Sequence, residues 1–203
     1  VVLSLCQKLR LPAWFNRLQI IDSTTISLFS NLIFKGVGRH PKTGKKKGGI
    51  KVHTNIHANE FVPSDIKFTS AATNDNFMLK PANYNDGDII AMDRAYIDYA
   101  RFDELTNRGV TYVTKMKKNL VYDTLSDTMY MLPCSLMECR VQVVEFRKHI
   151  KGGENIKHKA RIVTYVDPAK KKAKVISLLT NDMTMEVEDI IDIYRQRWEI
   201  ELL

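Results

Sequence analysis

The segment 88–92 (DIIAM) constrains the fold most, because it carries an uninterrupted apolar run that ends at Asp93. Such a run is typical of a central strand that is buried on both faces of a sheet. Residues 96–108 follow with apolar positions at helical spacing, and Gly109 then supplies a helix end. The segment therefore predicts an α/β fold.

Further strands are expected on both sides of this one. Residues 50–58 alternate, with apolar or small residues on one face and Lys51, His53, Asn55 and His57 on the other, which predicts a half-buried strand with a polar, partly basic face. Other strands are predicted at 19–21, 61–69, 110–116 and 175–179, and a long helix from about 184 to the chain end. The two histidines lack enough partners to bind zinc.

The order of elements divides the chain. Residues 1–18 are predicted as a helical lead-in broken at Pro12. Residues 118–172 hold short β-like runs between glycine and Asp-Pro turns, which predicts a mostly β insertion. An α/β core is left at 19–117 and 173–203.

Length and composition exclude several classes of protein. A chain of 203 residues is long enough for one hydrophobic core. No apolar run approaches the roughly 18 residues of a membrane-spanning helix. Three cysteines without a CxxC pair favour a reducing cytosol and argue against a disulfide framework or a thiolate zinc site.

The net charge of +8 is concentrated in two segments. Residues 35–51 hold seven basic residues and no acid, and residues 145–174 hold ten basic residues and three acids. The rest of the chain is therefore acidic. Each segment alone fits a solvated lysine-rich loop equally well, but the two together on an acidic body favour a nucleic-acid partner.

The last helix places two charged groups on its apolar side. With 100° per residue, Arg197 and Glu201 fall among isoleucines, Tyr194 and Trp198. Three explanations stay open at this point. The two groups could pair at i, i+4, the helix end could fray, or Glu201 could point into an acidic cleft that holds a metal.

Asp22 and Asp93 each follow an apolar strand. Either aspartate alone is explained by a turn or a helix cap. Ends of strands are also where open α/β sheets present ligands. Together with Glu201, the two aspartates predict a site for two Mg²⁺ or Mn²⁺ ions, which could activate one oxygen of a phosphodiester reaction and stabilise the leaving oxygen.

Five motifs carry a family resemblance. They are IIDSTTI (20–26), GGIKVHTNIH (48–57), DIIAMDRAYIDY (88–99), LLTND (178–182) and YRQRWEIE (194–201). Their combination resembles the DDE transposases of bacterial insertion sequences, in the branch with a β-strand insertion and a Tyr-x-x-Arg-x-x-x-Glu signature. Tyr194, Arg197 and Glu201 match that spacing, and the resemblance covers about residues 18–203.

The resemblance implies an RNase H-like mixed sheet flanked by helices, with the β insertion before the last helix. It implies that Asp22, Asp93 and Glu201 are catalytic metal ligands, Asp22 bridging both ions. It also implies cut-and-paste chemistry, in which strand nicking, a hairpin intermediate and attack of a 3′-OH on target DNA follow one another.

The implied partner is double-stranded DNA, at transposon ends and target, bound by a homodimer in the cytoplasm at the nucleoid. Expected DNA contacts are Tyr194, Arg197, Lys45, Lys46, Lys47, Lys51, His53, Arg94 and Tyr96. Two alternatives remain: an RNase H-like nuclease without strand transfer, and a silent DNA-binding remnant.

The chain departs from the family pattern in two respects. Relatives can stack a tryptophan of the insertion on a flipped base, but Trp14 and Trp198 both lie outside the insertion, and whether another aromatic residue such as Tyr122 or Tyr130 takes this role stays open. The chain also begins without methionine and stops within the last helix, so we expect a fragment that can fold without transposing.

Overall fold

The apolar run predicted as a central strand lies in the middle of the sheet. In the computed structural model it forms β4 (Ile89–Met92), whose four side chains are all buried. It pairs in parallel with β1 (Leu18–Ser27) on one side and with β5 (Thr111–Lys115) on the other. The prediction of a doubly covered strand is therefore confirmed.

The structure describes residues 11–27, 49–60, 62–132, 137–148, 155–167 and 174–200. Residues 199 and 200 are described by their backbone alone. The other strands are β2 (Gly49–His57), β3 (Val62–Ser70), β6 (Tyr122–Met131), β7 (Glu138–Lys148), β8 (Ile156–Asp167) and β9 (Lys174–Thr180). The α-helices are α1 (Tyr99–Asn107) and α2 (Val187–Ile200). Short 3₁₀ helices are η1 (Ala13–Arg17), η3 (Asp75–Phe77), η4 (Pro81–Asn83) and η5 (Arg94–Tyr96).

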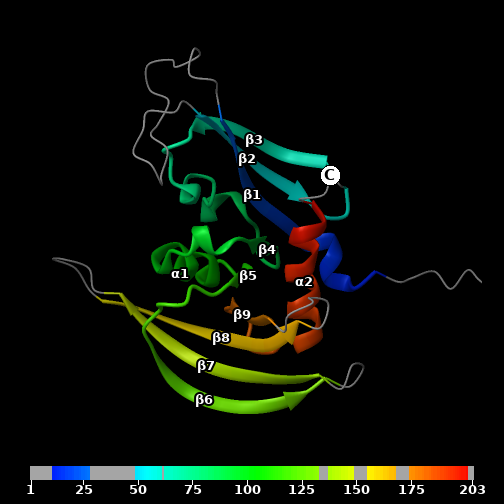
Figure 1. Ribbon diagram of the computed structural model, residues 1–203, viewed down its shortest axis with the longest axis vertical. Coiled ribbons are helices and arrows are strands. Elements are labelled where there is room, and N and C mark those ends of the chain that lie inside the picture. Colours follow the sequence, from blue (N-terminus) through cyan, green and yellow to red (C-terminus); the bar gives the residue numbers. More distant parts are fainter. Residues whose placement is uncertain are drawn as a thin grey trace, which may run out of the picture.

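The nine strands in the described ranges belong to one mixed sheet, in the order β3-β2-β1-β4-β5-β9-β8-β7-β6. The first five strands have the antiparallel and parallel arrangement of an RNase H-like core, so the predicted fold class is confirmed. The strands of the predicted insertion continue this sheet, because β9 pairs with β5 on one side and β8 on the other (Figure 1). The predicted boundaries of the insertion stay a prediction.

The two α-helices cover opposite faces of the sheet (Figure 1). Ile190, Ile193 and Tyr194 of α2 pack in one buried cluster with side chains of β1, β5 and β9. Phe102 and Leu105 of α1 pack in the other, against alternate residues of the same strands. Burial of these apolar side chains stabilises each layer, at about 25 cal/mol for each Å² removed from water.

Aromatic side chains join β7 and β8 to β5 and α1. The Tyr112 hydroxyl of β5 and Nε2 of His158 of β8 share a buried hydrogen bond of 2.6 Å. Tyr99 of α1 stacks on Phe146 of β7, with ring centroids 4.8 Å apart. Burial lowers the pKa of His158 to about 4, so the imidazole is neutral in this contact at pH 7.

The 3₁₀ helix η1 packs against α2. The predicted helical lead-in is described only from residue 11, where residues 13–17 form the 3₁₀ helix η1. Trp14 of η1 donates a hydrogen bond of 2.7 Å from Nε1 to Asp189 of α2. No helix within the described ranges has the length and apolar character needed to cross a membrane.

Two strands differ from the prediction. β1 does not end at Asp22 but runs on to Ser27, because its second half still pairs with β2 after β4 has ended. β6 has no counterpart among the predicted strands. Almost all of its side chains are exposed, so no buried face imposed the alternation of apolar and polar residues that identifies a strand.

Candidate active site

Asp22 and Asp93 follow paired residues of two parallel strands. Ile21 of β1 pairs with Met92 of β4, and each aspartate is the next residue along its chain. Neighbouring strands are about 4.8 Å apart. Asp22 and Asp93 are therefore brought together by the register of the sheet, although 71 positions separate them in the sequence.

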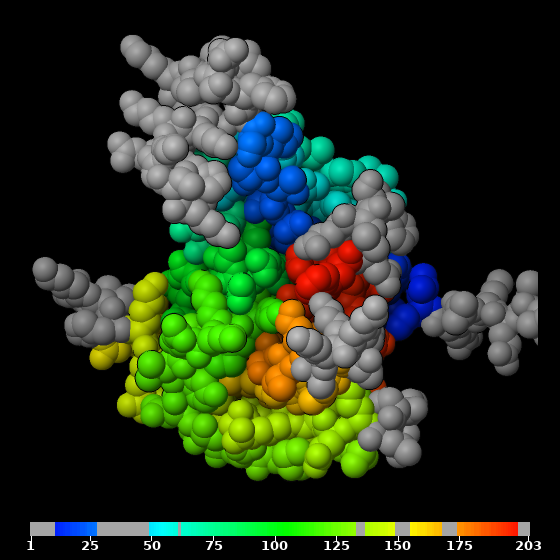
Figure 2. Space-filling model, viewed as in Figure 1, coloured from blue at the N-terminus to red at the C-terminus, as the bar shows by residue number. Residues whose placement is uncertain are grey.

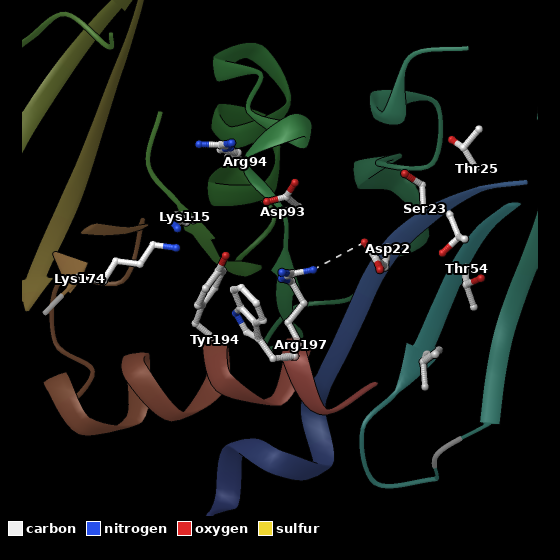
Figure 3. A pocket seen from close by; sticks show the side chains of 13 residues that line it. Asp22, Ser23, Thr25, Thr54, Asp93, Arg94, Lys115, Lys174, Tyr194 and Arg197 are labelled. Carbon is white, nitrogen blue, oxygen red and sulfur yellow. Dashed lines mark ion pairs between the residues drawn. The ribbon is translucent and has the colours of Figure 1, made fainter. Parts of the chain in front are cut away.

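Arg197 lies beside this pair of aspartates. Its Nη1 is 3.6 Å from Oδ1 of Asp22, and the arginine side chain is only 5% exposed (Figure 3). The guanidinium also lies over the rings of Tyr194 and Trp198, 5.5 and 5.2 Å from their centroids. The positive charge on the apolar side of the last helix thus faces a carboxylate of the sheet, a partner that the helix pattern alone did not indicate.

These side chains surround a cavity of about 840 Å³. Its lining residues are Asp22, Ser23, Thr24, Thr25, Thr54, Ile56, Asp93, Arg94, Lys115, Lys174, Tyr194, Arg197 and Trp198. Most of them come from the carboxyl ends of β4 and β5, the middle of β1 and β2, and one side of α2 (Figure 3). In the space-filling view, α2 (red) reaches the surface between β1 (blue) and β9 (orange) (Figure 2).

A polar network supports β1 immediately after Asp22. The Ser23 hydroxyl donates a hydrogen bond of 2.5 Å to Oδ1 of Asp75 in η3. Lys51 of β2 donates to the same oxygen at 3.0 Å and to the Thr73 carbonyl oxygen at 2.7 Å. The segment around η3 thereby holds β1 and β2 from the face opposite α2.

The alternation predicted for 50–58 is confirmed, but the polar face is the covered one. His53 is fully buried, with Nε2 2.8 Å from the Thr69 hydroxyl, and desolvation lowers its pKa. Phe77 of η3 packs against its ring, 5.8 Å between centroids. Thr54 and Ile56, on the other face, line the cavity.

The predicted DNA contacts are thus divided by the structure. Tyr194, Arg197 and Arg94 line the cavity with the two aspartates. Lys51 is paired with Asp75 and its side chain is 12% exposed. Tyr96 is buried, which raises the pKa of its hydroxyl. Lys51, Tyr96 and the buried His53 do not line the cavity. They pack behind the strands that form its wall.

The remaining predicted residues lie outside the described part of the chain. They are Glu201, Lys45, Lys46 and Lys47. Among the described residues no three Asp, Glu, His or Cys side chains form a metal site. The described donors that fit Mg²⁺ are the carboxylates of Asp22 and Asp93, with hydroxyl groups of the threonines and serine beside them.

Eight of the cavity residues had not been predicted as site residues, and among them Lys115 and Lys174 carry charge. Lys115 is the last residue of β5, so it occupies the same edge of the sheet as Asp93 at the end of β4. The rule that identified the aspartates, ligands at the carboxyl ends of parallel strands, also selects this lysine. Lys174 had no such signal, because its position depends on the pairing of β9 with distant strands.

Comparison with known proteins was made against this geometry. Residues 13–203 match the family described as "Transposase DDE domain". The chain is 24% identical over 197 residues to a probable transposase for insertion sequence element IS5377 of Geobacillus stearothermophilus, covering 91% of this chain and 46% of that protein. It is 25% identical over 189 residues to a putative transposase for insertion sequence element IS4SA of Synechocystis sp. (strain ATCC 27184 / PCC 6803 / Kazusa), covering 90% and 48%.

The chain thus spans about half the length of the curated relatives it matches. The family match extends over nearly the whole chain and includes both aspartates and α2. The sheet order, the paired aspartates and this match agree, and the chain belongs to the transposase DDE domain family.

Proposed function

We propose that this chain is the catalytic domain of a DNA transposase that cleaves and joins phosphodiester bonds with the help of divalent metal ions. One observation carries the proposal: the Ile21–Met92 pairing brings Asp22 and Asp93 into one cavity beside Arg197. Two carboxylates and several cations in one cavity suit a phosphate and a hard metal ion together.

Asp22, Asp93 and Glu201 are the proposed ligands of two Mg²⁺ or Mn²⁺ ions. The third ligand rests on its spacing, four residues after Arg197 in the Tyr-x-x-Arg-x-x-x-Glu signature. When bound, such ions supply an activated oxygen nucleophile and stabilise the leaving oxygen. Positively charged side chains lie beside the carboxylates and complete a site for a negatively charged substrate.

Arg197 and Tyr194 are the proposed contacts to the phosphate at the cut. Arg197 is held by Asp22 and by the rings of Tyr194 and Trp198, so its guanidinium is already oriented when DNA arrives. Orientation before binding lowers the cost of ordering a flexible side chain. Arg94, Lys115 and Lys174 add positive charge around the same cavity.

The full reaction that we propose is cut-and-paste transposition at the nucleoid by a homodimer, with a hairpin intermediate. Its substrates are double-stranded transposon ends and target DNA. Cleavage and joining share one chemistry, attack of an oxygen nucleophile on phosphorus, so one site can perform both steps.

A strand-transfer assay tests the proposal. The chain is incubated with labelled end-containing DNA and a target plasmid in Mg²⁺ or Mn²⁺, and nicked, hairpin and joined products are separated. We expect nicking and joining by wild type, and neither by Asp93→Asn or Glu201→Gln. Nicking without joining would favour a plain nuclease. Equal residual nicking by wild type and both variants would exclude the proposed metal ligands.

A further inference from the structure

A second cavity adjoins the first and is lined by positive charge. Its volume is about 490 Å³, and it shares Arg94, Lys115 and Lys174 with the cavity that contains the two aspartates. Lys117 and Lys118, which follow Met116 after the end of β5, add two further cations. Among the described residues lining it there is no Asp or Glu. Figure 3 shows Arg94, Lys115 and Lys174 on the side of Asp93 that faces away from Asp22.

Two parts of the fold build this second cavity. Lys117 and Lys118 leave the core at the end of β5, where the Met116 amide donates a hydrogen bond of 2.8 Å to the Ser177 carbonyl oxygen of β9. Tyr122, the first residue of β6, lies at the start of the insertion and is fixed edge-on to Phe146, with ring centroids 5.4 Å apart. The cations are therefore presented by backbone that is hydrogen-bonded or packed on the sheet.

The occupant of the second cavity must be strongly anionic and continuous with the occupant of the first. A nucleic-acid strand meets both conditions, since its phosphates repeat about every 3.4 Å along a duplex and each one can be neutralised by a lysine or arginine. An acidic protein segment would meet the charge condition, but nothing in the first cavity, with its own two carboxylates, would continue its path.

We propose that this second cavity binds the phosphate backbone of the DNA strand on one side of the cut, with Lys117 and Lys118 as direct phosphate contacts. The inference rests on the proposed function, because the first cavity is taken to hold the scissile phosphate. The inference gives a role to the junction between the core and the predicted insertion, because side chains from both parts line one path for the DNA strand.

Salt-dependent DNA binding tests this assignment. Binding of a fluorescein-labelled DNA duplex is followed by anisotropy over a series of salt concentrations in EDTA, so that no metal-dependent cleavage occurs. For Lys117→Gln/Lys118→Gln we expect the slope of log affinity against log salt to become shallower by about 2, roughly 0.9 for each lost phosphate contact. The single variant Lys118→Gln, at an exposed side chain, is expected to lose about half of that.

Lys157→Gln/Lys159→Gln is the matched control. It removes the same charge from two exposed lysines at the opposite end of β8, since Arg161 pairs with Thr180 whereas Asp167 pairs with Lys174 near the cavity. We expect its slope to equal that of wild type. If the slope became equally shallow in both double variants, the change would come from net charge alone, and the inference would be overturned.

The binding measurements, together with the nicking assay in Mg²⁺ or Mn²⁺, separate this inference from the proposed function. Wild-type slopes in the Lys117/Lys118 variant, with nicking intact, would overturn the second cavity as a DNA site and leave the catalytic proposal standing. A shallower slope in a chain that never nicks DNA would support the DNA path and count against catalysis. Absence of any DNA binding by wild type would overturn both.

Discussion

The two adjoining cavities differ in one respect that matters for chemistry. Both are lined by Arg94, Lys115 and Lys174, but only the first also contains carboxylates, from Asp22 and Asp93. The carboxylates come from the parallel strands β1 and β4, whereas the second cavity also uses residues that follow β5 and the first residue of β6. On our proposals, the cations of both cavities bind DNA, and the carboxylates placed among them in the first cavity add metal-dependent cleavage.

The largest expected effect separates the two cavities by function. Asp93→Asn removes one proposed ligand while preserving size, and we expect nicking in Mn²⁺ to fall by about a thousandfold. DNA affinity in EDTA should remain at least as high as that of wild type, because a negative charge is lost. Asp192→Asn, at an exposed aspartate on the same helix as Arg197, should nick normally. A parallel loss in both variants would contradict the division.

The second expected effect lies outside both cavities, at the buried contact between Tyr112 of β5 and His158 of β8. His158 is neutral in the fold, with a pKa of about 4 against 6.5 for an exposed histidine. Between these values the unfolded chain takes up a proton that the folded chain does not, so the free energy of unfolding falls as the pH drops through this window, by up to about 3 kcal/mol. The full contribution is present above about pH 6.5.

Urea unfolding of wild type and His158→Gln at about pH 7.5 and about pH 4.5 measures this contribution. The fall in stability on acidification should be smaller in the variant, because its side chain does not titrate. Identical falls in the two proteins would mean that carboxylates elsewhere account for the acid sensitivity.

The third expected effect concerns Arg197, whose guanidinium pairs with Asp22 and lies over two aromatic rings of α2. Arg197→Met removes the cation from a buried position next to a partly exposed carboxylate, and we expect the free energy of unfolding to fall by about 2 kcal/mol, somewhat less than for a fully buried pair. Arg195→Met, which breaks an exposed pair with Asp192, should cost less than about 1 kcal/mol. Equal costs would show that the Asp22 contact contributes no more than a surface pair.

The smallest expected effect lies outside both cavities. Trp14→Phe removes the hydrogen bond to Asp189 and should lower the free energy of unfolding by about 1 kcal/mol. Nicking and the salt dependence of DNA binding should be unchanged. A change in either would show that η1 influences the site through α2.

Periodicity made the core and part of the site predictable. An apolar run buried on both faces identified β4, and the 3.6-residue period of α2 placed Arg197 and Tyr194 on its buried side. Both signals are local, because each depends on residues close in the chain. The two aspartates were found for the same reason, since each follows a local apolar run.

Other features depend on contacts between distant segments. Alternation showed that β2 has two faces, but only the packing of η3 against His53 decides that the polar face is the covered one. The end of β1 depends on its pairing with β2, and the position of Lys174 depends on the pairing of β9. None of these pairings leaves a pattern within a single segment.

Direct metal binding tests the central claim, that Asp22 and Asp93 form a metal site for phosphodiester chemistry. Mn²⁺ binding is measured by electron paramagnetic resonance for wild type, Asp22→Asn, Asp93→Asn and the surface variant Asp127→Asn, which removes an exposed carboxylate paired with Arg140. We predict that wild type and Asp127→Asn bind Mn²⁺ equally, and that each of the other variants loses at least about tenfold in affinity. Equal Mn²⁺ affinity in all four proteins would contradict the account.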